Sequence, residues 1–224
     1  MPLKMVVQSV LGFLLLGLLL FPAAGTVAWP GAWAFLLLFS AGGLATGLWL
    51  RRTDPGLLAG RMASPLRADQ RPWDRAVMAA ILLACAAWLV TVGLDRRFGW
   101  SHAPFWTQAL GAALITASFG GFALVLSVNS FAAITVRVQG ERGQTVISTG
   151  PYAVVRHPMY AFALFLMTGV SLLLGSLWGL AGLVLFLPLL AARAAGEEAV
   201  LMAGLPGYAA YAAKVRFRLL PGLW

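Results

Sequence analysis

The chain has 224 residues, of which 61% are hydrophobic and only 10% are charged. Soluble domains are nearer half apolar and a quarter charged, so this composition excludes an ordinary soluble protein and indicates a polytopic membrane protein. A net charge of +9 would suggest nucleic-acid binding in a soluble protein. In a membrane protein, basic residues collect in cytoplasmic loops, so we expect a membrane partner and no nucleic acid.

Four segments in the first 128 residues are apolar enough to cross a bilayer, at about 5–25, 31–50, 76–94 and 105–128. The first has features of a signal peptide, but further apolar segments follow it, so we interpret it as a retained span. The arginine-rich segment 51–75 is amphipathic in places. This pattern favours an interfacial segment against anionic lipid, with substrate gating as the alternative.

The second half of the chain begins with a polar segment, 129–157, which is followed by a nearly continuous apolar stretch from Pro158 to Ala195. A single helix of that length would extend about 57 Å, far more than a bilayer requires. We therefore predict a hairpin that turns near Gly175 and Ser176, with tilted, kinked or interfacial pieces as the alternative. The predicted fold is an all-α polytopic membrane protein with five or six transmembrane helices, a C-terminal helical hairpin and a cytoplasmic tail.

The basic residues predict the orientation in the membrane. With a cytoplasmic N-terminus, every Lys and Arg except Arg96 and Arg97 lies on the cytoplasmic side, as the positive-inside rule requires. Both termini are then cytoplasmic, and the Ala-, Leu- and Arg-rich composition suggests a bacterial inner membrane. The hairpin also brings the segment before Pro158 and the residues around Arg193 to the same membrane surface.

One motif places titratable groups at that surface. Gly150-Pro151-Tyr152 is followed by Arg156-His157-Pro158-Met159-Tyr160, and Pro158 is suited to the first position of a helix. A lone histidine more often bonds a loop carbonyl than takes part in chemistry. The tyrosines and the arginine around His157, however, would together hold a polar cofactor at the membrane face.

A second group of charges follows one hairpin later, at Arg193, Glu197 and Glu198. On a helix, Arg193 and Glu197 share a face, so the simplest interpretation is an ion pair. Glu198 lies about 140° further round the helix from Arg193. It therefore needs another cationic partner, from the protein or from the ammonium or sulfonium of a ligand.

These motifs, with the later Gly207-Tyr208, Tyr211 and Leu220-Pro221-Gly222, resemble the isoprenylcysteine carboxyl methyltransferase family and the related phospholipid methyltransferases. The resemblance covers about residues 129–224. It implies that the strip before the Gly-Pro-Tyr motif and the motif itself contact the cofactor, that Glu198 holds the cofactor, and that Arg193 lies where cofactor and acceptor meet. The implied cofactor-binding residues are Gln144, Thr145, Val146, Ile147, Tyr152, His157, Pro158, Met159, Tyr160 and Glu198.

The resemblance implies an integral membrane methyltransferase that uses S-adenosylmethionine and accepts a lipophilic acceptor from the bilayer. The acceptor is an isoprenylcysteine-like carboxylate, a phospholipid amine or a small thiol. Arg193 would orient a carboxylate, whereas an amine or thiol needs a proton acceptor, with His157 and Glu197 as candidates. Arg193 and Glu197 are thus the predicted catalytic residues. The chain divides into N-terminal transmembrane helices at 1–128 and a catalytic cofactor-binding region at 129–224.

The sequence has no Rossmann glycine motif and no cluster of metal-ligand spacing. One alternative is a membrane reductase of the sterol-reductase type, in which Arg137 and Arg142 would bind the extra phosphate of NADPH. The other alternative is a membrane scaffold or transporter, which would bind no cofactor.

Overall fold

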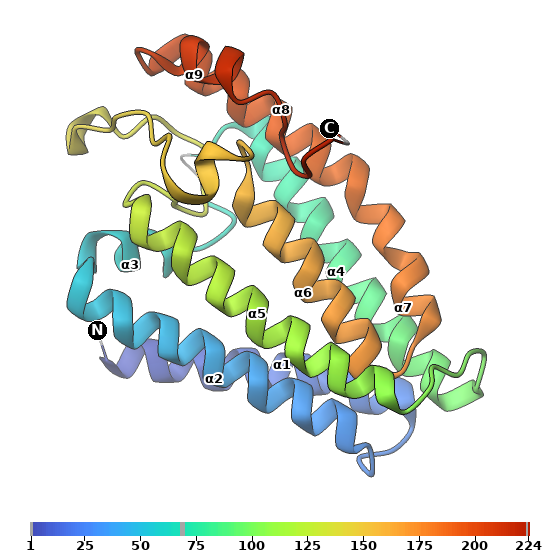
Figure 1. Cartoon of the computed structure of the whole chain (residues 1–224). Coiled ribbons are helices and arrows are strands. Elements are labelled where there is room, and N and C mark those ends of the chain that lie inside the picture. The colour runs from blue at the N-terminus through green and yellow to red at the C-terminus, as the bar shows by residue number, and fades with distance from the viewer. Residues whose placement is uncertain (1, 68–69, 223) are drawn as a thin grey trace.

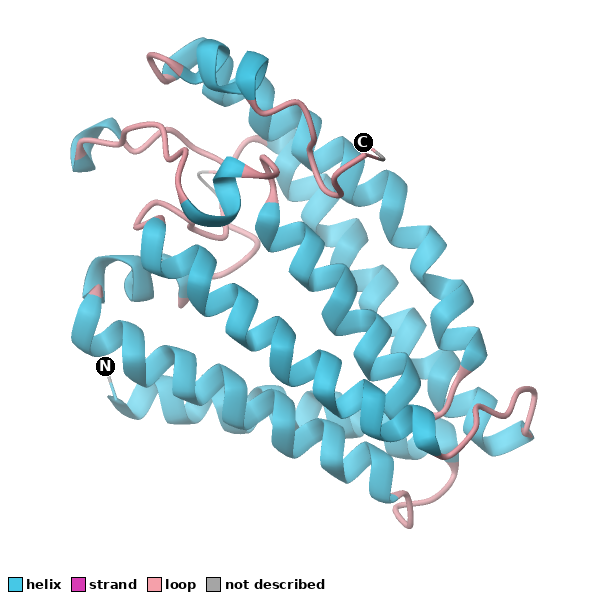
Figure 2. Cartoon of the chain, viewed as in Figure 1, coloured by secondary structure: helices cyan, strands magenta, loops and turns pink. Residues whose placement is uncertain are grey.

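The computed structural model describes residues 2–67, 70–222 and 224, and in this part of the chain every regular element is helical (Figures 1 and 2). The predicted all-α fold is therefore confirmed. The α-helices are α1 (Pro2–Ala24), α2 (Pro30–Thr53), α3 (Pro55–Arg61), α4 (Pro72–Phe98), α5 (Trp106–Val128), α6 (Pro158–Leu174), α7 (Leu177–Gly182), α8 (Phe186–Gly204) and α9 (Tyr208–Lys214). Short 3₁₀ turns cover Gly140–Arg142, Gly150–Ala153 and Leu183–Leu185, the last of which joins α7 to α8.

Five of these helical stretches are long and apolar enough to span a membrane, namely Leu3–Ala24, α2, α4, α5 and the continuous stretch Leu177–Gly204. Helix α6 is apolar but has only 17 residues. The predicted hairpin turns where expected. Gly175 ends α6 in the left-handed conformation, with φ of 74°, and the Ser176 hydroxyl accepts a hydrogen bond from Gly179 N to begin α7.

Two segments are more helical than the sequence pattern indicates. Within 51–75, α3 begins at Pro55, with Asp54 accepting a hydrogen bond from Leu57 N at 2.8 Å. Proline at a first helical position and aspartate as N-cap are both favourable, which explains this short helix. Helix α8 continues beyond Ala195 as far as Gly204, so Glu197 and Glu198 lie on a rigid helix and not in a tail.

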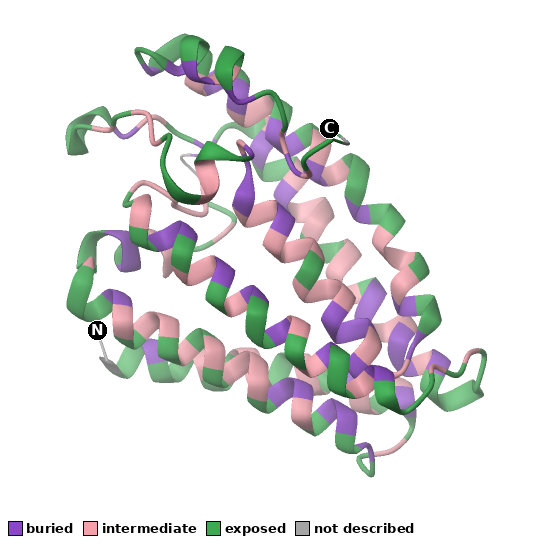
Figure 3. Ribbon diagram, in the orientation of Figure 1, coloured by how far each residue is buried: buried purple, intermediate pink, exposed green. Residues whose placement is uncertain are grey.

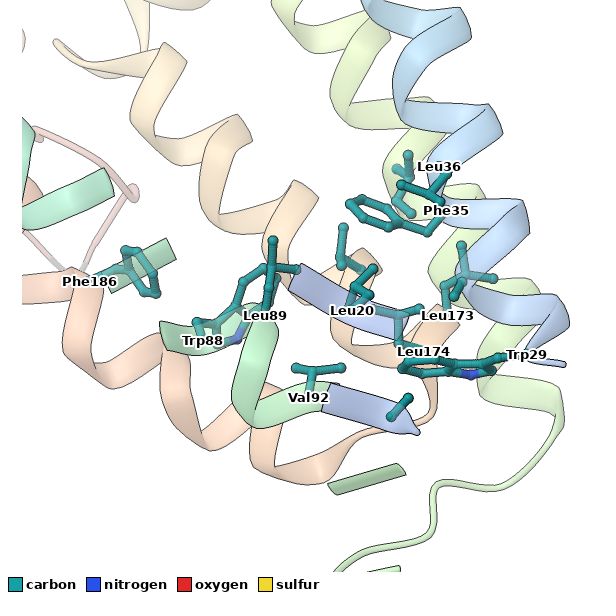
Figure 4. Packing of buried hydrophobic residues seen from close by; sticks show 14 of the residues in the cluster. Leu20, Trp29, Phe35, Leu36, Trp88, Leu89, Val92, Leu173, Leu174 and Phe186 are labelled. Carbon is teal, nitrogen blue, oxygen red and sulfur yellow. The ribbon is translucent and has the colours of Figure 1, made fainter. Parts of the chain in front are cut away.

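The main hydrophobic core lies between the spans, and Figure 4 shows Trp88, Leu89 and Val92 of α4 near Phe186 of α8 and Leu20 of α1. Trp88 also donates from its indole N–H to the Gly179 carbonyl at 2.8 Å. Buried residues on the helices face inward, whereas many outward-facing positions are exposed, as Figure 3 shows. Because these exposed positions are largely apolar, the bundle has the surface expected of a protein in lipid.

Helices α5 and α6 lie closest together, because glycines face each other across their interface. A Cβ added at Gly111 would lie 2.3 Å from Leu173 N and 2.6 Å from the Gly169 carbonyl oxygen. Small residues allow membrane helices to approach in this way. This contact joins the start of α5 to the end of α6. Towards the other end of the same pair, a Cβ added at Gly121 would lie 2.3 Å from the Phe162 ring, so α5 also packs closely against the first turns of α6, next to the His-Pro motif.

The connections gather at the two ends of the bundle. At one end, the loops around Trp29, Ser101 and Gly175 meet, and the buried Asp95 accepts hydrogen bonds from Ser101 N at 2.7 Å and Ser101 Oγ at 2.6 Å. At the other end lie both chain termini, α3, the 129–157 segment and α9 (Figure 1). The two motifs are therefore at the same end, although which membrane face this is stays a prediction.

Candidate active site

A cavity of about 340 Å³ opens among the segments gathered at the end of the bundle that carries α3 and α9. This volume is within the range of small-molecule sites. Its walls come from the 131–137 and 144–147 strips, the first turns of α6, the end of α8 and the tail helix α9. The predicted site residues that line it are Gln144, Thr145, Val146, Ile147, Tyr152, His157, Pro158, Met159, Tyr160, Arg193 and Glu197.

The His-Pro motif is held at the cavity by the C-terminal tail. The backbone amides of Arg156 and His157 donate to the carbonyls of Phe217 and Arg218, at 2.9 Å and 2.8 Å. Pro158 then begins α6. The buried imidazole of His157 stacks on Tyr160 with ring centroids 5.3 Å apart and planes within 3°. The motif is thus fixed on both sides of the peptide that starts the helix.

Glu198, the one predicted residue outside the cavity lining, joins three segments of the chain. Its carboxylate receives hydrogen bonds from Arg156 Nε at 2.7 Å and Arg218 Nε at 3.0 Å, and it lies 3.1 Å from His157 Nε2. The side chains of Glu198 and Arg156 are only 8% and 9% exposed. The cationic partners of Glu198 therefore come from the protein. Contact between Glu198 and the cofactor stays a prediction, whereas its bonds to Arg156 and Arg218 give it a structural role.

Glu197 is the carboxylate that faces the cavity. It accepts a hydrogen bond from the Tyr160 hydroxyl at 2.8 Å and lies 3.7 Å from His157 Nδ1, with its side chain 32% exposed. In the described part of the chain, no arginine pairs with it. Glu197 and His157 are the two candidate proton acceptors of the sequence, and the structure places them in contact.

Arg193 does not form the ion pair with Glu197 that helical spacing suggests. Its Nε lies 3.2 Å from Asp74 Oδ1, and its Nη2 donates to the Ile134 carbonyl. Asp74 is fully buried near the start of α4 and also accepts from Gln70 at 2.6 Å and from Val136 N at 3.2 Å. Arg193 therefore connects α8, α4 and the 134–136 strip of the cavity wall.

Tyrosines form the wall towards the tail. The Asn129 amide donates to the Tyr152 hydroxyl at 2.7 Å, and the Tyr211 hydroxyl donates to the Tyr152 carbonyl at 2.9 Å. Burial raises the pKa of Tyr152 and Tyr208 above the ordinary value of tyrosine, and it raises the pKa of Tyr211 to about 12. These phenols are therefore neutral at physiological pH and act as hydrogen-bond partners and aromatic surfaces.

Sequence reasoning missed three residues that shape this site: Asp74, Arg218 and Arg61. Arg61, at the end of α3, lines the cavity and donates from Nη1 to the Ala132 carbonyl at 3.0 Å. A weak signal existed for Asp74, because an acidic residue directly after Pro72 is typical of a first helical turn. No local pattern reveals the partners that place the three residues at the site, namely Arg193 for Asp74, Glu198 for Arg218 and the Ala132 carbonyl for Arg61. Each of these partners is distant in the sequence.

The arginines assigned to NADPH in the reductase alternative have other partners. Arg142 donates to Gln139 at 2.8 Å and lies 3.8 Å from Asp54, and it does not line the cavity. Arg137 lines the cavity but pairs with Glu141 at 3.4 Å in an exposed position. The geometry thus offers no paired phosphate site to this alternative.

Comparison with known proteins agrees with the resemblance found in the motifs. Residues 106–205, from the start of α5 to the end of α8, match the model of the phospholipid methyltransferase family. A search of curated proteins finds no significant match. Members of the family are enzymes that take the methyl group from S-adenosylmethionine. The matched region contains the His-Pro motif, Arg193 and both glutamates, so over these residues this membrane protein is similar to the phospholipid methyltransferase family.

Proposed function

We propose that the protein transfers a methyl group from S-adenosylmethionine to the amine of a phospholipid at this cavity. The family match supports a lipid acceptor. One observation favours an amine over a carboxylate as acceptor, namely which partners the two predicted catalytic residues have. The Arg193 guanidinium is bound to Asp74 and to the Ile134 carbonyl, whereas the Glu197 carboxylate faces the cavity with no arginine partner in the described chain.

The residues around the cavity suit the cofactor. Its sulfonium and ammonium are cationic, and the cavity offers the Glu197 carboxylate and the rings of Tyr160, Tyr208 and Tyr211. Its polar groups would also find the backbone of the strip from Gln144 to Ile147. S-adenosylmethionine supplies a methyl group on a sulfonium, and transfer forms a nitrogen–carbon bond while the carbon–sulfur bond breaks and leaves its electron pair on sulfur.

The protein's own part is to bind, orient and deprotonate the acceptor. Glu197 attracts the ammonium of the phospholipid and accepts a proton from it, which frees the nitrogen lone pair. The Tyr160 hydroxyl, 2.8 Å away, holds the carboxylate in place, and the Glu197 side chain, which is 32% exposed, passes the proton on to solvent.

A direct test reconstitutes the purified protein in vesicles that contain phosphatidylethanolamine, a long-chain isoprenoid carboxylic acid or a long-chain thiol, each with radiolabelled S-adenosylmethionine. We expect label in the phospholipid amine. Replacement Glu197→Gln should lower the rate by about 100-fold, a typical contribution of general-base catalysis. The matched control is Glu141→Gln, because Glu141 is exposed and pairs with the exposed Arg137. Label in the carboxylic acid or the thiol alone would show that the acceptor is wrongly assigned.

A further inference from the structure

We propose that Arg61 binds the phosphate diester of the acceptor phospholipid, and that this contact makes the enzyme select amines attached to a phosphate. The inference rests on the proposed function and adds the residue that recognises the other end of the headgroup. It assigns a substrate-binding role to α3, a segment that lies outside the region matched by the family model.

The backbone around Arg61 is fixed where a lipid headgroup would lie. Asp54 caps the start of α3, and Leu57 and Leu58 are buried with Met5 and Leu126 in a second apolar cluster. This cluster joins α3 to the ends of α1 and α5. Helix α3 therefore lies at the end of the spans, at the level of the membrane surface, and not loose in solution.

In the described part of the chain, the charge of Arg61 has no counterion. Arg61 is partly buried and lines the cavity, and its guanidinium donates a hydrogen bond to the neutral Ala132 carbonyl. Among the residues that the structure describes, no carboxylate lies within ion-pair distance of it. The other arginines around the site all have a carboxylate partner: Arg137, Arg142, Arg156, Arg193 and Arg218.

A half-buried cation without an anion is unfavourable, and a bound phosphate would remove that cost. Burial also lowers the pKa of Arg61, which indicates how poorly solvated its charge is. Four of the five guanidinium N–H groups remain for a ligand after the bond to Ala132. Arginine is the side chain best suited to a phosphate, because its planar fork donates two parallel hydrogen bonds.

The cavity holds opposite charges that match a zwitterionic headgroup. Arg61 and Glu197 both line the same cavity, together with Tyr152. A phosphate at Arg61 and an ammonium at Glu197 would each find a partner. Phe122 of α5 and Ala163 of α6 line the same cavity and offer an apolar surface to the lipid chains.

The test compares two acceptors in vesicles: phosphatidylethanolamine, and octadecylamine, which has an amine but no phosphate. We expect Arg61→Gln to lower kcat/KM for phosphatidylethanolamine by roughly 10- to 100-fold, as for loss of a hydrogen-bonded charge. The loss with octadecylamine should be under about threefold, and the Kd for S-adenosylmethionine should not change. The matched control is Arg52→Gln, because Arg52 is exposed in the last turn of α2 near the same surface.

Each result separates the two proposals. If the wild-type protein transfers no label to the phospholipid amine, the proposed function is wrong, and the inference that rests on it is wrong as well. If the wild type is active and Arg61→Gln has the wild-type kcat/KM for phosphatidylethanolamine, the inference alone is overturned. An equal loss of kcat/KM with both acceptors also overturns it, because such a loss would indicate a structural role for Arg61. If Arg61→Gln does not fold, the wild-type preference decides: equal kcat/KM values for the two acceptors would overturn the inference.

Discussion

Glu198 should stabilise the folded site, and its replacement tests this most directly. Its carboxylate is the only acidic partner of Arg156 in the described chain, and both side chains are nearly buried. Replacement Glu198→Ala would leave the Arg156 guanidinium buried without a counterion. Breaking a buried pair in this way costs about 3–5 kcal/mol. Glu198→Gln keeps a hydrogen-bond acceptor but loses the charge, so we expect a smaller cost of about 1.5–3 kcal/mol.

The chain supplies its own probe for this measurement. Cys85 is the only cysteine, and it packs against the main core from α4, so a thiol-reactive fluorophore reports unfolding of detergent-solubilised protein. At about 2–4 °C per kcal/mol for a chain of this size, Glu198→Ala should lower the midpoint by roughly 6–20 °C. Glu141→Gln, which alters only an exposed ion pair, should shift it by little.

The alternative role of Glu198 makes a different prediction. If its carboxylate acts only on the cofactor, both Glu198 variants keep the wild-type midpoint without ligand and lose affinity for S-adenosylmethionine. That result would refute the stabilising role. The stabilising role would be supported if the variants have a lower unfolding midpoint without ligand and bind S-adenosylmethionine with wild-type affinity at a temperature at which they are folded.

Two further predictions concern the residues that hold the cavity walls. Asp74→Asn should lower the single-turnover rate at saturating cofactor by about tenfold, because Arg193 and the 134–136 strip lose their charged anchor; a wild-type rate would show that Arg193 needs no such partner. Tyr211 has a pKa raised to about 12 by burial, so the folded state holds its proton more tightly than the unfolded state does. Its contribution to stability is complete below about pH 10 and is lost as the pH rises towards 12. The gap between the unfolding midpoints of wild type and Tyr211→Phe should therefore shrink from pH 9 to pH 11, and a constant gap would contradict the assignment.

Much of the fold follows from local sequence. Apolar length predicts the spans, and Gly175 and Ser176 predict the hairpin turn, because a left-handed glycine and a capping serine act within a few residues. The composite motif, from Gly150 to Glu198, resembles the family whose model matches residues 106–205, and its spacing also indicates which groups the hairpin brings together. Helix ends are less certain from sequence, as the longer α8 and the short α3 show.

The partners of the charged residues were decided only by the tertiary structure. Sequence spacing pairs Arg193 with Glu197, but the fold brings Asp74 of α4 to Arg193 and leaves Glu197 facing the cavity. It likewise brings Arg218 of the tail to Glu198. Helical periodicity describes neighbours on one helix, whereas a buried charge pairs with the nearest opposite charge in space. The sequence by itself therefore determined the two motifs that meet at the site. The packing of α4, α8 and the tail added Asp74 and Arg218 to them, and it decided which charges face the cavity.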